Sequence, residues 1–241
     1  MNKHEIVLLA SGTRGDVQPY LALGLGLQQA GYPIRIATHA TFREMVERYS
    51  LPFSLLEGNP SELMTRSGGQ SALTYDGNPI RSIQGTLRFY QAARPLYKRL
   101  LESAWQACRG VRAIVAGLPT NWAIHISESL GVPCIWAFLQ PFSRTRAYSS
   151  SLLPFNFRLG PFYNRFTHRL VEQFIWQPWR VTINHWRQRT LGIPPAPFTG
   201  YFSQLYTPST VILYGYSPRL APPPPDWPAN HQVTGYWFLE E

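Results

Sequence analysis

The sequence predicts an α/β fold with a mostly parallel sheet and helices on both faces, and three observations support this prediction. Short continuous apolar runs such as residues 6–10 are typical of central parallel strands, which are buried on both sides. Segments with apolar residues at helical spacing alternate with these runs. A glycine-containing loop, residues 11–16, follows the first run, and open parallel sheets bind ligands beside such loops.

The first third of the chain shows the alternation most clearly. Gly31 ends the first expected helix, and the strand that follows places Ile34 and Ile36 on one face. The elements expected here are a strand at 6–10, a helix at 17–30, a strand at 33–38, a helix at 42–49 and a strand at 53–56. Residues 65–79 are polar and glycine-rich, which predicts a mobile loop.

The rest of the chain begins with a long helix, because apolar residues recur at helical spacing over residues 80–108. The elements expected after it are a strand at 112–118, a helix at 120–130 capped by Thr120, a strand at 133–139, a loop to 161, a helix from there to 190 and a strand at 210–216. Residues 217–228 contain four consecutive prolines and predict an extended linker. We therefore expect a domain at 1–216, and at 217–241 a linker with the start of a further domain.

Composition excludes several classes of protein. Hydrophobic residues make up 44% of the chain and charged residues 15%, which is typical of a globular protein. Cys108 and Cys134 are too few for a disulfide framework or a structural zinc site, so we expect free thiols in a reducing compartment. No apolar run reaches the roughly 18 residues of a membrane span, and the N-terminal run is too short for a secretory signal. These features predict a cytoplasmic protein.

Positive charge is concentrated in one segment. Residues 144–189 hold eight arginines and a single acid, Glu172, interleaved with ten aromatic residues. Arginine with aromatics is compatible with nucleic acid, with an anionic membrane surface or lipid-like acceptor, or with an amphipathic helix whose arginines are only solvated. Lys3 and Lys98 are the only lysines, so this chain uses arginine for nearly all of its positive charge, inside and outside this segment. We therefore expect no nucleic-acid partner, and the other two interpretations stay open.

The loop Gly12-Thr13-Arg14-Gly15-Asp16 joins the first strand to the first helix. Glycines there allow a ligand to approach the backbone closely, and a helix N-terminus favours negative charge. Asp16 can serve as the helix N-cap or as a general base that faces a cleft. Both roles are compatible only if the carboxylate keeps a second oxygen free.

Other motifs are absent or favour structural roles. Gly24-Leu25-Gly26 with Gly31 has the wrong spacing for a dinucleotide site and lies inside a helix, so close packing explains it better. The sequence has no P-loop, no GxSxG serine motif and no histidine spacing typical of metal ligands, so we expect no metal site. His39 follows the second strand at the ligand edge of the sheet, where we interpret it as a structural loop histidine rather than a catalytic one.

One family resembles the chain along nearly its whole length. The motifs that carry this resemblance are IVLLASGTRGDVQPYLALGLGLQQAGYPIRIATHATFREMV, ALTYDGNPIRS, LGVPCIWAFLQP, NRFTHRLVEQ and YGYSPRLAPPPPDWPANHQVTGYWF. They are similar to the N-terminal domain of GT-B glycosyltransferases of family 28 and the UDP-glycosyltransferase type, which include sterol glucosyltransferases and antibiotic-aglycone glycosyltransferases. The resemblance implies a Rossmann-like domain that holds the acceptor and faces a second domain that binds the nucleotide sugar.

The resemblance also implies roles for individual residues. In such enzymes the acid of the GTRGD loop removes the proton of the acceptor hydroxyl, and this acid is Asp16. The acceptor is expected between the ends of the first, fourth and fifth strands. The acceptor-binding residues implied are Gly12, Thr13, Arg14, Gly15, Gln18, Asn121, Phe138, Gln140 and Phe142. A UDP-sugar is the expected co-substrate, with inversion at the sugar, no metal and no tightly bound cofactor.

The chain departs from the family pattern in two ways. Some relatives place a histidine in the first loop and support it with an aspartate, but the turn at 117–119 contains no acid. Nothing after Tyr216 is long enough to form a sugar-donor domain. We therefore expect the acceptor half of a glycosyltransferase acting on a hydrophobic hydroxylated acceptor (a sterol, lipid or polyketide-like molecule), inactive without a donor domain. The alternative is a non-catalytic lipid or membrane-surface module that makes peripheral contact through residues 144–190.

Overall fold

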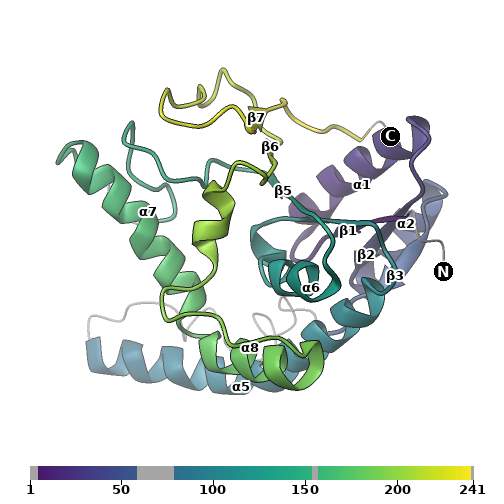
Figure 1. Cartoon of the computed structure of the whole chain (residues 1–241), viewed down its shortest axis with the longest axis horizontal. Helices are drawn as coiled ribbons and strands as arrows, with labels where there is room; N and C mark the ends of the chain where they lie inside the picture. The colour runs from purple at the N-terminus through teal and green to yellow at the C-terminus, as the bar shows by residue number, and fades with distance from the viewer. Residues whose placement is uncertain (1–4, 59–78, 154–156, 240–241) are drawn as a thin grey trace.

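A seven-stranded, fully parallel sheet forms the centre of the molecule (Figure 1). The computed structural model describes residues 5–58, 79–153 and 157–239. The strands are β1 (Ile6–Leu9), β2 (Ile34–Thr38), β3 (Phe53–Leu55), β4 (Ala113–Ala116), β5 (Cys134–Phe138), β6 (Ile212–Tyr214) and β7 (His231–Val233), in the order β3-β2-β1-β4-β5-β6-β7. The predicted parallel sheet is confirmed. The strand order reverses direction at β1, which lies between β2 and β4 and forms the topological switch point of the sheet.

Helices cover both faces of the sheet, as the buried runs predict. Val7 and Leu9 of β1 belong to one hydrophobic cluster, and Ile6 and Leu8 belong to the other. The helical segments are α1 (Arg14–Gln29), η1 (Ala40–Phe42), α2 (Arg43–Arg48), α5 (Pro79–Ala107), η2 (Leu118–Thr120), α6 (Ala123–Leu130), α7 (Pro161–Trp176), α8 (Arg180–Trp186), the π-helical η3 (Arg187–Leu191) and η4 (Phe202–Tyr206). The first cluster packs beneath α5 and α6, and the second packs beneath α1, so each strand of the centre is buried on both sides.

Some helix boundaries differ from the prediction. Helix α1 begins at Arg14 rather than at residue 17, because Thr13 takes the N-cap position one turn earlier. The single helix expected from 161 to 190 is wrong: α7 ends at Trp176 and α8 begins at Arg180. Pro178 lies in the break, where it lacks the N–H that a continuous helix would need. The glycine-rich loop expected at 65–79 lies outside the described residues except for Pro79, the first residue of α5.

The C-terminal segment adds a strand that the sequence analysis missed. Strand β7 pairs with β6 in parallel and extends the edge of the sheet, while residues 217–230 contain no helix or strand. The chain then returns toward α1 (Figure 1), where the ring of Trp237 lies edge-on to Tyr20 at 6.4 Å. A Cβ on Gly215 would lie 3.0 Å from the indole of Trp237, so this glycine allows the ring to approach the backbone. The division of the chain after residue 216 stays a prediction.

Candidate functional site

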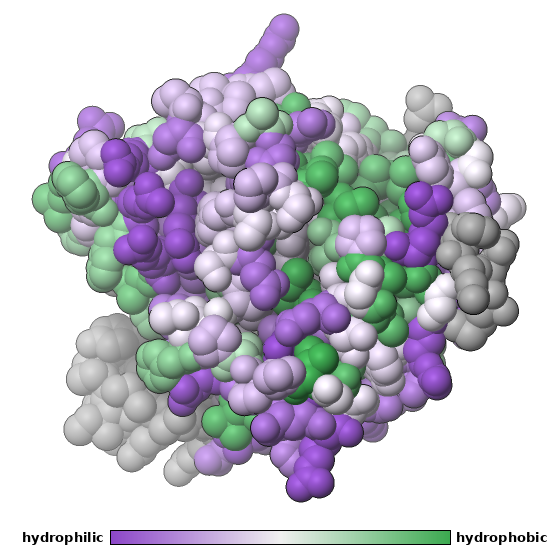
Figure 2. Space-filling model, viewed as in Figure 1, coloured by the Kyte–Doolittle hydropathy of each residue, from purple (hydrophilic) through white to green (hydrophobic). Residues whose placement is uncertain are grey.

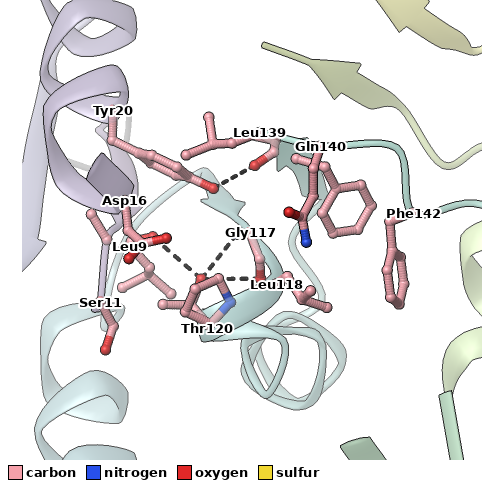
Figure 3. Close-up of a pocket in the computed structure, with 14 residues that line it drawn as sticks. Leu9, Ser11, Asp16, Tyr20, Gly117, Leu118, Thr120, Leu139, Gln140 and Phe142 are labelled. Atoms are coloured by element: carbon pink, nitrogen blue, oxygen red, sulfur yellow. Dashed lines mark hydrogen bonds between the residues drawn. The ribbon is translucent and has the colours of Figure 1, made fainter. Parts of the chain in front are cut away.

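A cavity of about 120 Å³ opens at the carboxyl ends of β1, β4 and β5, beside the switch point of the sheet (Figure 3). Three loops and the first turns of α1 form it. Its lining residues are Leu9, Ala10, Ser11, Asp16, Tyr20, Gly117, Leu118, Pro119, Thr120, Ala137, Phe138, Leu139, Gln140 and Phe142. The structure thus brings Asp16 together with Phe138, Gln140 and Phe142, four of the residues that the sequence analysis named.

Hydrogen bonds hold the Asp16 carboxylate from one side. Thr13 donates to Oδ2 of Asp16 from its backbone N–H at 2.7 Å and from its hydroxyl at 2.9 Å. Asp16 is therefore the third residue of α1 in a capping arrangement with Thr13, rather than the N-cap itself. Within the described chain, Oδ1 of Asp16 accepts no hydrogen bond. The carboxylate thus keeps its second oxygen free, as both roles of Asp16 require, and Asp16 lines the cavity.

Gly12 makes this arrangement of Asp16 possible. Its φ of +124° lies in a region that side chains with a Cβ rarely adopt. A Cβ at Gly12 would also lie 2.4 Å from Oδ2 of Asp16, closer than any real contact. Glycine at position 12 is thus required by the backbone and by the carboxylate that packs on it.

Tyr20 lies one turn after Asp16 on α1 and forms a wall of the cavity. Its hydroxyl donates to the carbonyl oxygen of Ala137 at 2.6 Å, and a Cβ on Gly117 would lie 2.2 Å from that hydroxyl. Burial raises the pKa of Tyr20 well above its usual value, with smaller contributions from Cys134 and Asp16. Tyr20 is therefore a neutral hydrogen-bond donor in the wall. Tyr20 was not among the predicted site residues, although its position four residues after Asp16 places both side chains on one face of the helix.

The other walls are apolar or internally bonded. Phe138 and Phe142 are almost fully buried, and their ring centroids lie 5.1 Å apart. The hydroxyl of Thr120 accepts a hydrogen bond from the N–H of Gly117 at 2.9 Å and lies 3.3 Å from the carbonyl oxygen of Leu9 (Figure 3). Thr120 lies in η2 and α6 begins only at Ala123, so the predicted cap of that helix is wrong. Thr120 instead ties the loop after β4 to β1.

The remaining predicted site residues lie outside the cavity lining. Gly12 packs against the Asp16 carboxylate, and Thr13 donates hydrogen bonds to it. The Arg14 side chain donates a hydrogen bond to the side chain of Gln18 at 3.1 Å along α1. Gly15 and Gln18 border a separate cavity of about 350 Å³ against residues 236–239. Asn121 donates to the carbonyl of Leu118, and its side-chain oxygen accepts a hydrogen bond from the hydroxyl of Tyr201. Their expected contact with an acceptor stays a prediction.

Ser11, which lines the cavity, forms a buried pair with His39. The Nε2 atom of His39 lies 2.8 Å from the hydroxyl of Ser11, and its Nδ1 atom lies 3.0 Å from the carbonyl oxygen of Leu56. A carbonyl oxygen can only accept, so Nδ1 carries the proton and Ser11 donates to Nε2. His39 connects three segments of the core, in agreement with its interpretation as a structural residue.

Three of the eight arginines in the charged segment have clear structural roles. The guanidinium of Arg144 pairs with both oxygens of buried Glu172, with Nε 2.8 Å from Oε1. Arg187 pairs with Glu128 at 2.7 and 2.9 Å and also donates to Nδ1 of His125. Arg180 lies over the ring of Phe198. In the described part of the chain, the five other arginines form no ion pair; they are Arg146, Arg158, Arg165, Arg169 and Arg189.

The described ranges contain no side-chain cluster typical of a metal site and no helix typical of a membrane span. Within residues 5–58, 79–153 and 157–239, no three histidine, cysteine or acidic side chains gather as a metal would require. Over the same ranges, no helix is both long and apolar enough to span a bilayer. Cys108 and Cys134 are free thiols, as predicted, and burial raises the pKa of both.

Several known proteins are similar to this chain in sequence or in fold. The pattern of the glycosyltransferase family 28 N-terminal domain matches residues 6–149. The chain is 36% identical over 240 residues to a sterol 3-beta-glucosyltransferase of Leptosphaeria maculans and 36% identical over 238 residues to one of Candida albicans. These matches cover 98% and 99% of this chain but only 15% of each relative. The chain thus spans about 15% of the length of these relatives.

Solved structures show the same architecture at low sequence identity. The calicheamicin glycosyltransferase CalG4 superposes with a TM-score of 0.65 at 12% identity, over 98% of this chain and 53% of that one. The Streptomyces glycosyltransferase SsfS6, solved with thymidine diphosphate, gives a TM-score of 0.51 at 15% identity, over 96% of this chain and 52% of that one. The sheet is therefore that of the N-terminal domain of GT-B glycosyltransferases. Together with the sequence matches, this shows that the chain belongs to glycosyltransferase family 28.

Proposed function

We propose that the chain is the acceptor-binding half of an inverting glycosyltransferase and that Asp16 is its general base. One observation carries this proposal: Asp16 lines the cavity, Thr13 holds its Oδ2 atom, and its Oδ1 atom has no hydrogen bond in the described chain. A hydroxyl is a weak nucleophile until its proton is removed, and a positioned carboxylate supplies roughly 100- to 10,000-fold in rate. The fixed carboxylate is suited to this task because its orientation is set before the acceptor arrives.

The proposed acceptor is a hydrophobic molecule that carries a hydroxyl group, such as a sterol. The cavity of about 120 Å³ is walled by Phe138, Phe142 and Leu118. It is smaller than the roughly 300–1,000 Å³ of typical small-molecule pockets. It therefore receives only the reacting end of such an acceptor, with the hydroxyl directed at Asp16. The relatives named as sterol 3-beta-glucosyltransferases make a sterol the first acceptor to test.

In the proposed reaction Oδ1 of Asp16 takes the proton of the acceptor hydroxyl as its oxygen attacks the anomeric carbon of the sugar. The new glycosidic bond forms on the face opposite the leaving nucleotide diphosphate, which departs with the electrons of the broken bond. A UDP-sugar is the proposed co-substrate, and a sugar-donor half supplies its site. SsfS6, about half of whose chain is matched here, was solved with thymidine diphosphate, which supports a nucleotide-sugar reaction on this fold.

Asp16→Asn tests this proposal in a full-length enzyme in which the chain is joined to a sugar-donor half. Asparagine keeps the size of the side chain but cannot accept the proton at neutral pH. Transfer to a sterol should fall by roughly 100-fold or more, while the affinity for the acceptor stays unchanged. Glu44→Gln, which removes an exposed carboxylate of α2, is the matched control and should leave transfer intact. Unchanged turnover in Asp16→Asn would overturn the assignment of the base.

The requirement for a donor half has its own test. The chain alone should give no glycosyl transfer with UDP-glucose and a sterol, because the proposed donor site lies in the other half. A clear product signal from the chain alone would contradict this part of the proposal.

We also propose peripheral membrane contact through the segment 144–190, because α7 exposes an aromatic face. Phe162 is 87% exposed and Phe166, one turn later, is 58% exposed, while Leu159 before the helix is 69% exposed. Figure 2 shows hydrophobic residues along the edge of the molecule where α7 lies, beside a band of hydrophilic ones. Exposed phenylalanines beside unpaired arginines are typical of a surface that inserts into an anionic interface. A non-catalytic membrane module remains the alternative to an acceptor domain.

Vesicle co-sedimentation tests this membrane contact. Phe162→Ser with Phe166→Ser should reduce binding to vesicles that contain anionic lipid. Val211→Ser with Leu220→Ser removes two other exposed apolar side chains outside residues 144–190 and should leave binding unchanged. Equal binding by both double variants would contradict a contact through α7.

A further inference from the structure

A cavity lined by charged residues lies at the edge of the sheet opposite β3. Its volume is about 410 Å³, and it lies between the loop after β5, the first turns of α7, η4 and the segment before β7. The charged residues that line it are Arg144, Arg146, Arg165 and Asp226. The proposed transfer reaction uses none of these residues.

The charges of this cavity are only partly neutralised from within. Arg144 is paired with Glu172, so the positive charge of Arg144 is neutralised. The oxygens of Asp226 accept hydrogen bonds from the hydroxyl of Thr145 and, at 2.8 Å, from the N–H of Arg146. The guanidinium groups of Arg146 and Arg165 are exposed and have no hydrogen bond or ion pair in the described chain. Two arginines therefore face one carboxylate, and the excess charge is positive.

The backbone beneath these arginines is held in place by three other segments. The N–H of Arg144 donates to the hydroxyl of Tyr206 in η4 at 3.0 Å. The side chain of Asn164 in α7 donates to the carbonyl oxygen of Arg146 at 2.9 Å. Asp226 accepts the N–H of Arg146 from the third side. The positions from which the Arg146 and Arg165 side chains extend are thus fixed relative to each other, which lowers the cost of ordering a ligand between them.

We propose that this cavity binds a phosphate monoester through Arg146 and Arg165. A guanidinium group presents a planar fork of N–H donors that matches phosphate oxygens, and a monoester carries about 1.5 to 2 negative charges at neutral pH. The hydroxyl of Ser203, exposed at the same cavity, supplies a further donor. The phosphate belongs either to a lipid headgroup or to a soluble molecule. Arg165 lies between Phe162 and Phe166 in α7, so a lipid-borne phosphate would reach the cavity beside the exposed aromatic face.

This inference goes beyond the proposed transfer reaction and is tested without it. Inorganic phosphate is titrated by calorimetry into the chain and into two double variants with the same change in charge. The variant Arg146→Gln with Arg165→Gln should bind phosphate at least about 10-fold more weakly, because each guanidinium contributes a charge-assisted hydrogen bond. The control, Arg158→Gln with Arg169→Gln, removes two exposed arginines of the same segment that do not line the cavity.

A second arm distinguishes the two sources of phosphate. Vesicles of phosphatidylcholine are compared with vesicles that also contain phosphatidic acid, a phosphomonoester lipid, or phosphatidylserine. A preference for phosphatidic acid that only the cavity variant loses identifies a lipid headgroup. Phosphate binding that the cavity variant loses, with vesicle binding unchanged, identifies a soluble ligand. Non-saturable phosphate binding by the chain, or an equal loss of affinity in both double variants, would overturn the site.

Discussion

The cavity at the ends of β1, β4 and β5 and the edge formed by α7 differ in how their polar groups are satisfied. In the cavity, the hydrogen bonds of Thr13, Tyr20 and Thr120 are made within the protein, and one oxygen of Asp16 is left over. At the α7 edge, arginines without acidic partners lie beside exposed phenylalanines. The first region therefore suits the single proton transfer that we propose, and the second suits the external contact that we propose.

The largest effect is expected for Gly12→Ala. The added methyl group requires an unfavourable backbone angle and would lie 2.4 Å from Oδ2 of Asp16, so the carboxylate must move. A displacement of about 1 Å is expected to lower transfer roughly 100-fold in a full-length enzyme. Gly26→Ala is the matched control in α1, where an added Cβ meets nothing within 4 Å and should stabilise the helix slightly. Equal transfer by both variants would show that the position of Asp16 does not matter.

The second prediction separates structural arginines from those available for ligands. Arg144→Met leaves Glu172, which is 2% exposed, without its cationic partner. Loss of one partner from a buried ion pair typically lowers the free energy of unfolding by about 3–5 kcal/mol. Arg158→Met, at an exposed site without an ion pair, should change it by less than about 0.5 kcal/mol. Urea unfolding of both variants measures the difference, and similar stabilities would contradict the distinction.

The third prediction concerns acid. Burial lowers the pKa of His125 to about 3, with a further contribution from the charge of Arg187, and burial lowers the pKa of His231 to about 4. Unfolded histidine titrates near 6.5, so between about pH 6.5 and pH 4 the unfolded chain binds more protons than the folded chain. The free energy of unfolding should therefore fall as the pH drops through this window. His231→Gln should weaken the dependence, and urea midpoints that do not vary with pH would contradict this account.

The smallest expected effect is that of Tyr20→Phe. The change removes the donor to the carbonyl oxygen of Ala137 and should lower the free energy of unfolding by about 1–3 kcal/mol, because the acceptor stays buried. Tyr32→Phe, at a tyrosine that is 43% exposed, is the control and should have little effect. Equal thermal midpoints for the two variants would show that Tyr20 contributes packing alone.

Local patterns explain which parts of this structure the sequence could predict. The strands of the centre are continuous apolar runs, and Gly12, Thr13 and Asp16 interact within one loop. Their arrangement therefore follows from spacing along the chain. The contact of Tyr20 with Ala137 joins residues 117 positions apart, and no local signal marks it. The charged segment shows the same limit, because a count of arginines does not reveal that Arg144 pairs with Glu172.

Short or interrupted elements were the other source of error. Strand β7 has only three residues, too few for an alternating pattern to stand out from the Pro-rich segment before it. The break between α7 and α8 has a visible cause in Pro178, yet apolar and aromatic residues continue at helical spacing on both sides. Proline is not sufficient by itself to end a helix in this chain, because α1 continues through Pro19 and α5 continues through Pro95.

Rescue of Asp16→Ala by formate in a full-length enzyme tests most directly whether Asp16 is the general base. This variant removes the carboxylate and leaves space beside Thr13 for a small external base. If Asp16 removes the proton of the acceptor, transfer by the variant is slow and rises with formate concentration, while the rate of the unaltered enzyme does not respond. Transfer by Asp16→Ala at the rate of the unaltered enzyme, without formate, would contradict the claim.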